Sequence, residues 1–81
     1  MQHVPERSAA ELKAFSRLIL NHENRVELID LVRESTGTNA AYEMILDKTG
    51  DTAVARAGRW LKVLLIKYPK ESEEIIETSS V

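Results

Sequence analysis

The chain has no cysteine, little glycine and proline, and one Trp, two Tyr and one Phe as its whole aromatic content. Without cysteine, disulfides, thiolate-bound zinc and cysteine nucleophiles are excluded, so the fold must gain its stability from packing or association. The three glycines stand apart at positions 37, 50 and 58, which excludes a glycine-rich phosphate-binding loop. So few aromatic residues leave little for stacking on single-stranded nucleic acid.

Long apolar segments are also missing. The longest apolar run is Val63 to Ile66, far shorter than a bilayer span, and the first ten residues lack an apolar segment of signal-peptide length. We therefore expect a cytoplasmic protein that does not enter a membrane.

The chain length and the net charge further limit the possible folds and functions. The 81 residues predict one helical domain, 1–81, with loose termini at 1–7 and 78–81. A domain of this size buries roughly 60% of its unfolded surface, so it is only marginally stable and association would help it. Eleven basic against thirteen acidic residues give a net charge of −2, so nucleic-acid binding would need a local basic patch.

The apolar spacing predicts helices throughout. Ser8 and Glu11 fit a capping box at the start of a first helix over 9–21. A second helix is expected over 25–35, with Asn24 as its cap and Gly37 as its stop.

A third, mostly buried helix starts at Thr38 or Asn39 and ends at Thr49-Gly50. The longest helix is expected over 52–67, capped by Asp51 and ended by Pro69. Residues 70–77 could form a short fifth helix or fray. The fold class that follows is all-α, a compact bundle of four main helices, antiparallel or steeply crossed, with a short fifth helix left open.

The segment Asp47-Lys48-Thr49-Gly50-Asp51 resembles the phosphorylated DKTGT signature of P-type ATPases. Asp51 replaces the final threonine of that signature, and 81 residues leave no room for the remaining phosphorylation machinery. The same residues fail a calcium loop because Lys48 and Gly50 stand where oxygen ligands are needed. We interpret the segment as a helix stop followed by a helix cap.

No other chemical motif can be assembled. The two histidines, His3 and His22, give no metal-ligand spacing, and no serine has a histidine at a defensible placement for a catalytic triad. A helix-turn-helix centred on Gly37 or Gly50 fails, because polar residues follow each glycine where apolar ones are required. We therefore expect no catalytic, cofactor-binding or metal-binding residues, no small-molecule substrate, and no enzyme activity.

Residues 52–70 carry five basic side chains and no acidic one, whereas 71–77 carry four glutamates and no base. At 100° per residue the core side of the 52–67 helix holds Val54, Ala57, Leu61, Leu64, Leu65 and Tyr68. Two β-branched residues lie among the bases on its opposite side, where a purely solvated face rarely has them. The predicted partner-binding residues are Arg56, Arg59, Lys62, Val63, Ile66 and Lys67.

Several interpretations of this face stay open. It could be solvated; the C-terminal segment could fold back on it, with Ile75 and Ile76 on Val63 and Ile66; or another molecule could cover it. We expect a non-enzymatic protein interaction module of the adaptor or assembly type. It would act by self-association into an oligomer or by binding an acidic amphipathic partner. The alternative is a nucleic-acid-binding or regulatory protein that uses the same bases for phosphate contacts.

Overall fold

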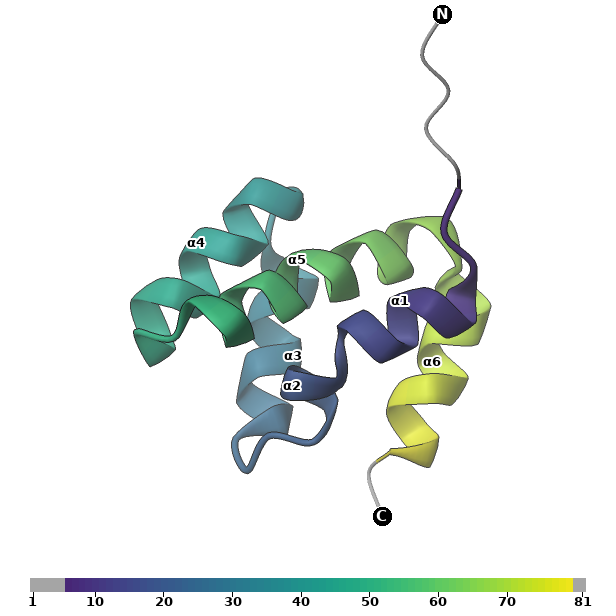
Figure 1. The fold of residues 1–81 in the computed structure, drawn as a ribbon, viewed down its shortest axis with the longest axis horizontal. Helices are drawn as coiled ribbons and strands as arrows, with labels where there is room; N and C mark the ends of the chain where they lie inside the picture. The colour runs from purple at the N-terminus through teal and green to yellow at the C-terminus, as the bar shows by residue number, and fades with distance from the viewer. Residues whose placement is uncertain (1–5, 80–81) are drawn as a thin grey trace, which may run out of the picture.

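The computed structural model describes residues 6–79, and in this range the chain is an all-α compact globule without strands. Its extents are 40 × 26 × 20 Å. Helices occupy most of the described chain (Figure 1): α1 (Ala9–Phe15), α2 (Arg17–Leu20), α3 (Arg25–Glu34), α4 (Thr38–Thr49), α5 (Thr52–Lys67) and α6 (Pro69–Thr78).

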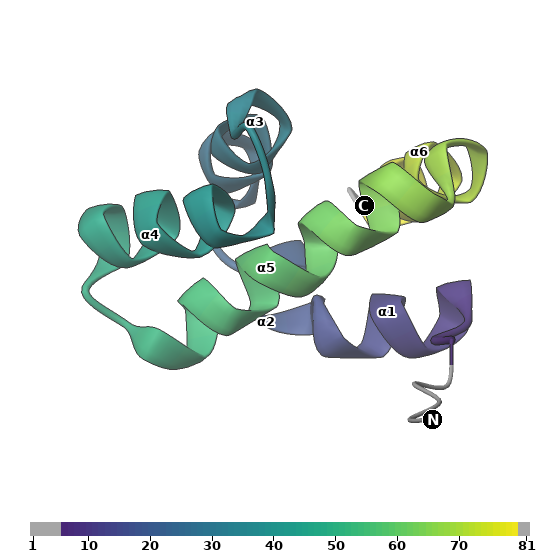
Figure 2. The same ribbon diagram turned by 90° about the horizontal axis from the view of Figure 1, so that it is seen from above.

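The longest helix, α5, is the centre of the fold. It packs against each of the other five helices, most extensively against α4. Figures 1 and 2 show α4 and α1 running along α5 on either side of it, while α3 and α6 cross it steeply. The all-α fold class is therefore confirmed for the described residues.

The core forms between α5 and the helices around it. Its largest fully buried apolar side chains are Leu12, Ile19, Leu28, Val32, Ile45, Leu61 and Leu64. Gly58 makes the closest approach, because a Cβ atom there would lie 2.8 Å from Ile45 Cγ1 and 3.3 Å from Ile19 Cδ1. The missing side chain of Gly58 thus lets α4 and α2 approach α5 closely.

The predicted helix ends are mostly confirmed. Ser8 and Glu11 form the reciprocal capping box, and Asp51 accepts hydrogen bonds from the amides of Ala53 and Val54. Gly50 ends α4 with φ +68°, a left-handed conformation that glycine adopts without a steric penalty. Pro69 separates α5 from α6 and starts the new helix, where a missing amide proton costs nothing.

The single helix predicted over 9–21 is wrong, because the chain breaks at Ser16. Ser16 is fully buried, and its hydroxyl donates to the Leu12 carbonyl at 2.6 Å. Such a bond competes for the carbonyl four residues back and bends helices. The bend turns α2 away from the axis of α1, so residues 6–79 contain six helices, five of them seven residues or longer, instead of four main ones.

The predicted Asn24 cap is confirmed in position, since Asn24 is the N-cap residue of α3, but not in its hydrogen bond. The Asn24 side chain makes no capping hydrogen bond to α3. Instead its backbone amide donates to His22 Nδ1 at 3.0 Å. His22 therefore shapes the α2–α3 connection as a hydrogen-bond acceptor.

The segment after Pro69 is a helix, which decides the question left open by the sequence. Ser72 is fully buried on α6, and Ile75 and Ile76 pack partly buried against the core. Arg25 fastens the far end of this helix, because its guanidinium donates to the Ile76 carbonyl and to Ser79 Oγ, each at 3.0 Å.

The loose termini expected at 1–7 and 78–81 fall partly outside the described residues, since 1–5 and 80–81 are not described. Inside the described range the ends make contacts. The Tyr68 hydroxyl donates to the Arg7 carbonyl at 2.9 Å, and Thr78 is the last residue of α6.

Candidate interaction surface

The six predicted partner-binding residues all lie on α5, but they do not form one uniform surface. Arg56, Ile66 and Lys67 are exposed, whereas Arg59, Lys62 and Val63 are half-buried. Because α5 is surrounded by other helices, its half-buried side chains are directed toward particular neighbours. The contacts of each residue therefore decide which of them a partner can reach.

Arg59 is directed toward α4. Its guanidinium carbon lies 4.5 Å from the centre of the Tyr42 ring, and its Nε is buried without a hydrogen-bond partner in the described chain. A cation stacked on an aromatic face loses conformational freedom but keeps its charge. Arg59 thus presents a fixed positive charge at the border of α4 and α5.

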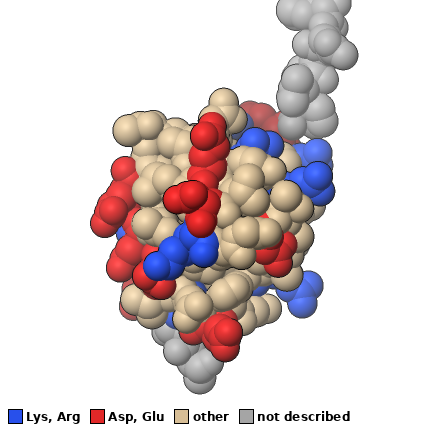
Figure 3. Space-filling model, turned by 90° about the vertical axis from the view of Figure 1, so that its left-hand side faces the viewer, with Lys and Arg blue, Asp and Glu red and all other residues tan. Residues whose placement is uncertain are grey.

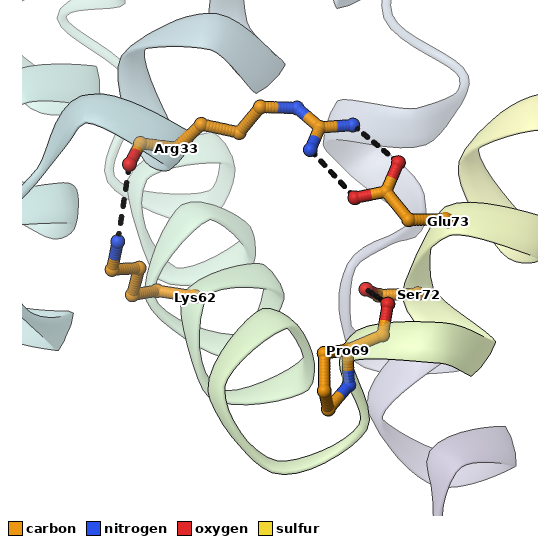
Figure 4. Close-up of polar contacts among 5 residues, drawn as sticks. All are labelled: Arg33, Lys62, Pro69, Ser72 and Glu73. Atoms are coloured by element: carbon orange, nitrogen blue, oxygen red, sulfur yellow. Dashed lines mark hydrogen bonds and ion pairs between the residues drawn. The ribbon is translucent and has the colours of Figure 1, made fainter.

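Lys62 is directed toward α3 rather than outward. Its ammonium group donates to the Arg33 carbonyl at 3.3 Å, near the C-terminal end of α3, where a cation is favoured by the helix dipole. The guanidinium of the same Arg33 binds Glu73 on α6 (Figure 4). Lys62 belongs to the contact that joins α3, α5 and α6.

The remaining two bases, Lys67 and Arg56, differ in whether their side chains have a partner. Lys67 lies 3.6 Å from Glu6, a long contact between two exposed side chains that water and salt weaken. Arg56 has neither an ion pair nor a hydrogen bond to its side chain within residues 6–79. Arg56 is consequently the base most available to another molecule.

The two apolar residues, Val63 and Ile66, also differ in how exposed they are. Val63 packs against the core, whereas Ile66 has 60% of its surface exposed. The spacing of three residues puts both on one side of α5, with Val63 turned further inward. Ile66 is therefore the apolar group that this face offers to solvent.

The C-terminal segment folds back, but it does not cover this face as one interpretation expected. Ile75 and Ile76 reach the core while Ile66 stays exposed. Glu73 pairs with Arg33 of α3 at 2.7 Å, so its carboxylate is not directed at a base of α5. The hydrogen bond from Arg33 lowers the pKa of the Glu73 carboxyl.

The aromatic residues beside this face were not predicted. Phe15 on α1 lies 5.1 Å from Trp60, centre to centre, and the Arg7 guanidinium lies 5.4 Å from the Phe15 ring. With Tyr42 on the α4 side, aromatic rings therefore flank α5 on both sides. Nothing in the sequence indicated that Phe15 would meet Trp60.

A second surface feature lies on α4. Glu43 and Asp47 are one helical turn apart, both exposed, and they line a shallow hollow together with Met44 and Leu46. We call these four residues the α4 edge. Figure 3 views the end of the molecule where α4 meets α5, and red acidic side chains spread over its left and centre.

The α4–α5 connection carries the segment that resembled a phosphorylation signature. Asp47 lies on a helix, and Asp51 caps the next one, so the interpretation as helix stop and cap is confirmed.

No family model, no curated protein and no solved structure matches this chain. Any function must therefore be argued from the contacts above. Within the described chain, no three acidic or histidine side chains gather in a group that could hold a metal ion. None of its helices, over the same residues, has the length and apolar character needed to cross a membrane.

Proposed function

We propose that this chain is a small non-enzymatic protein interaction module that binds its partner through the outer face of α5. We define this face as Arg56, Arg59, Val63, Ile66 and Lys67. The observation that carries the proposal is the 60% exposure of Ile66 on the helix that organises the whole core. A β-branched residue there gains free energy when a partner covers it.

The composition of the face supports a protein partner. Apolar contact at Ile66 would supply affinity, while Arg56 and Lys67 would attract acidic groups and orient the partner. Full burial of one isoleucine contributes about 1.5 to 3 kcal/mol before the cost of association is subtracted. Binding through this face is therefore weak by itself and suits assemblies with several contacts.

Nucleic acid is the alternative, and the contacts of the bases favour it less. Lys62 is bound to a carbonyl of α3, and Lys67 is close to Glu6. Phosphate binding needs several free cations along one track, because affinity rises with the number of phosphates neutralised. Arg56 without a partner and Arg59 on Tyr42 offer a short track at best.

The test is capture of partner proteins by the immobilised chain, using two matched serine variants. Ile66→Ser removes the apolar group of the outer face, and Val26→Ser changes an equally exposed residue on α3, where 67% of the side chain is exposed. Both variants should keep full helicity by circular dichroism, since neither side chain is buried. We expect a protein retained by the wild type and by Val26→Ser, and lost with Ile66→Ser.

Equal retention by all three proteins would contradict the proposal. A nucleic-acid function would instead give retention of a duplex or single strand at low salt that disappears between about 50 and about 200 mM salt. Val63→Ser is not a suitable probe of the surface, because Val63 packs against the core and its loss would also weaken the fold.

A further inference from the structure

We propose that the partner on the outer face of α5 is a second copy of this chain, which docks through its α4 edge. The inference rests on the interaction function proposed above and adds the identity of the partner. It follows from two complementary surfaces that one molecule carries at different places.

The α4 edge combines half-buried apolar side chains with unpaired acidic ones. Met44 and Leu46 are half-buried in the hollow, and neither Glu43 nor Asp47 has an ion pair or hydrogen bond to its carboxylate among residues 6–79. The neighbouring base does not neutralise them, because Lys48 pairs with Glu27 of α3 at 2.9 Å. The edge therefore presents two free carboxylates around apolar side chains.

The outer face of α5 is the inverse of this arrangement. It has an exposed apolar residue, Ile66, next to Lys67, which holds a long contact, and a free base, Arg56, ten residues earlier on the same helix. Placed together, the apolar parts exclude water while charges of opposite sign meet around them. Charge complementarity of this kind selects a partner and its orientation.

One molecule cannot satisfy both surfaces by itself. Asp47 lies in the last turn of α4, which adjoins the start of α5 at Thr52, whereas Ile66 lies fourteen residues beyond Thr52, about 21 Å along the helix at 1.5 Å per residue. The two surfaces must therefore meet between molecules. Because they are different surfaces, the contact is heterologous, and it builds a chain or ring of copies rather than a closed symmetric dimer.

Two charge reversals test the inference, and both should leave the fold intact. Arg56→Glu changes the outer face at an exposed site near the start of α5, where the helix dipole favours an acidic side chain. Asp47→Lys changes the α4 edge near the end of α4, where the dipole favours a basic one. Lys13→Glu on α1 and Glu74→Lys on α6 are the controls, since both residues are exposed and belong to neither surface.

The measurement is molar mass by light scattering, from about 10 µM to about 1 mM protein, a range that covers weak interfaces. We expect the mass of the wild type and of both controls to rise with concentration. Each of the two charge reversals should weaken association at least about tenfold. Their 1:1 mixture should associate as the wild type does, because an intact α4 edge can meet an intact α5 face while the reversed α5 face meets the reversed α4 edge.

The double variant Arg56→Glu with Asp47→Lys should associate again, since the opposite charges are exchanged. A wild type that stays monomeric throughout would overturn this inference, and the capture experiment would then still decide the proposed function separately. Association that Arg56→Glu abolishes but Asp47→Lys leaves unchanged would overturn the assignment to the α4 edge. Association unaffected by either reversal would overturn both surfaces.

Discussion

Arg33 on α3 holds Glu73 on α6 through two hydrogen bonds, of 2.7 and 3.0 Å, and so fastens the C-terminal helix across the bundle. The backbone of the same Arg33 accepts a hydrogen bond from Lys62 of α5. One residue therefore joins three helices. This contact holds the acidic C-terminal helix at α3 and leaves Ile66 on α5 uncovered.

The pairing predicts a specific acid sensitivity. Because Arg33 lowers the pKa of Glu73 below its ordinary value of 4.5, the carboxylate form is favoured by folding. Its contribution is complete above that value and is lost as the pH falls through the folded pKa. We expect Glu73→Gln to lower stability by at most about 1 kcal/mol at neutral pH, since the pair is exposed.

Urea unfolding of wild type and Glu73→Gln at about pH 7 and about pH 3 checks this, because the stability difference should become smaller as the pH falls. Glu11 also has a lowered pKa, chiefly from its backbone hydrogen bond with Ser8, and both proteins share that contribution. A difference that persists unchanged in acid would show that the Glu73 charge is not what stabilises α6.

Arg25 should control the other end of α6. Its guanidinium donates to the Leu20, Ile76 and Ser79 oxygens at 2.8 to 3.0 Å. Lysine cannot donate to all three oxygens in this way, because its compact ammonium lacks the planar, spread donors of a guanidinium. We expect Arg25→Lys to speed amide hydrogen exchange in the last turns of α6 while α4 and α5 keep their protection. Uniform loss of protection would instead indicate a role in global stability.

Gly58 should not tolerate a methyl group. An added Cβ would lie 2.8 Å from Ile45 Cγ1, a buried atom that cannot move away cheaply. Gly58→Ala gains helix propensity of about 1 kcal/mol, but overpacking costs typically about 1 to 3 kcal/mol, so a net loss is expected. Gly37→Ser is the matched control, since nothing lies within 4 Å of an added Cβ there. Thermal unfolding of both variants should show the loss of stability for Gly58→Ala and not for Gly37→Ser.

The two aspartates of the α4–α5 connection should behave differently. Asp51→Ala removes an oxygen that accepts from the Ala53 amide at 2.9 Å and the Val54 amide at 3.3 Å. The expected loss is about 1 kcal/mol of unfolding free energy. Asp47→Asn should leave stability unchanged, because Asp47 makes no such bond in the described chain. Chemical denaturation of the two variants compares them directly, and equal losses would contradict the cap assignment.

The sequence by itself determined the features that depend on a few neighbouring residues. The Ser8–Glu11 capping box, the Gly50 stop, the Asp51 cap and the break before Pro69 each involve atoms within about one helical turn. Local hydrogen bonds and backbone conformations need no knowledge of the rest of the chain. The core side of α5 followed in the same way from helical spacing, with Val54, Ala57, Leu61 and Leu64 buried and Leu65 and Tyr68 half-buried at its border.

Only the tertiary structure decided which side chains meet across the bundle. Ser16 bends the first helix because packing buries it completely, and sequence alone treats serine as a polar surface residue. The partner of Glu73, the ring under Arg59 and the exposure of Ile66 depend on how distant helices cross. Charge and periodicity place a residue on a helix face, but the neighbouring helix in space determines whether that face is covered, paired or free.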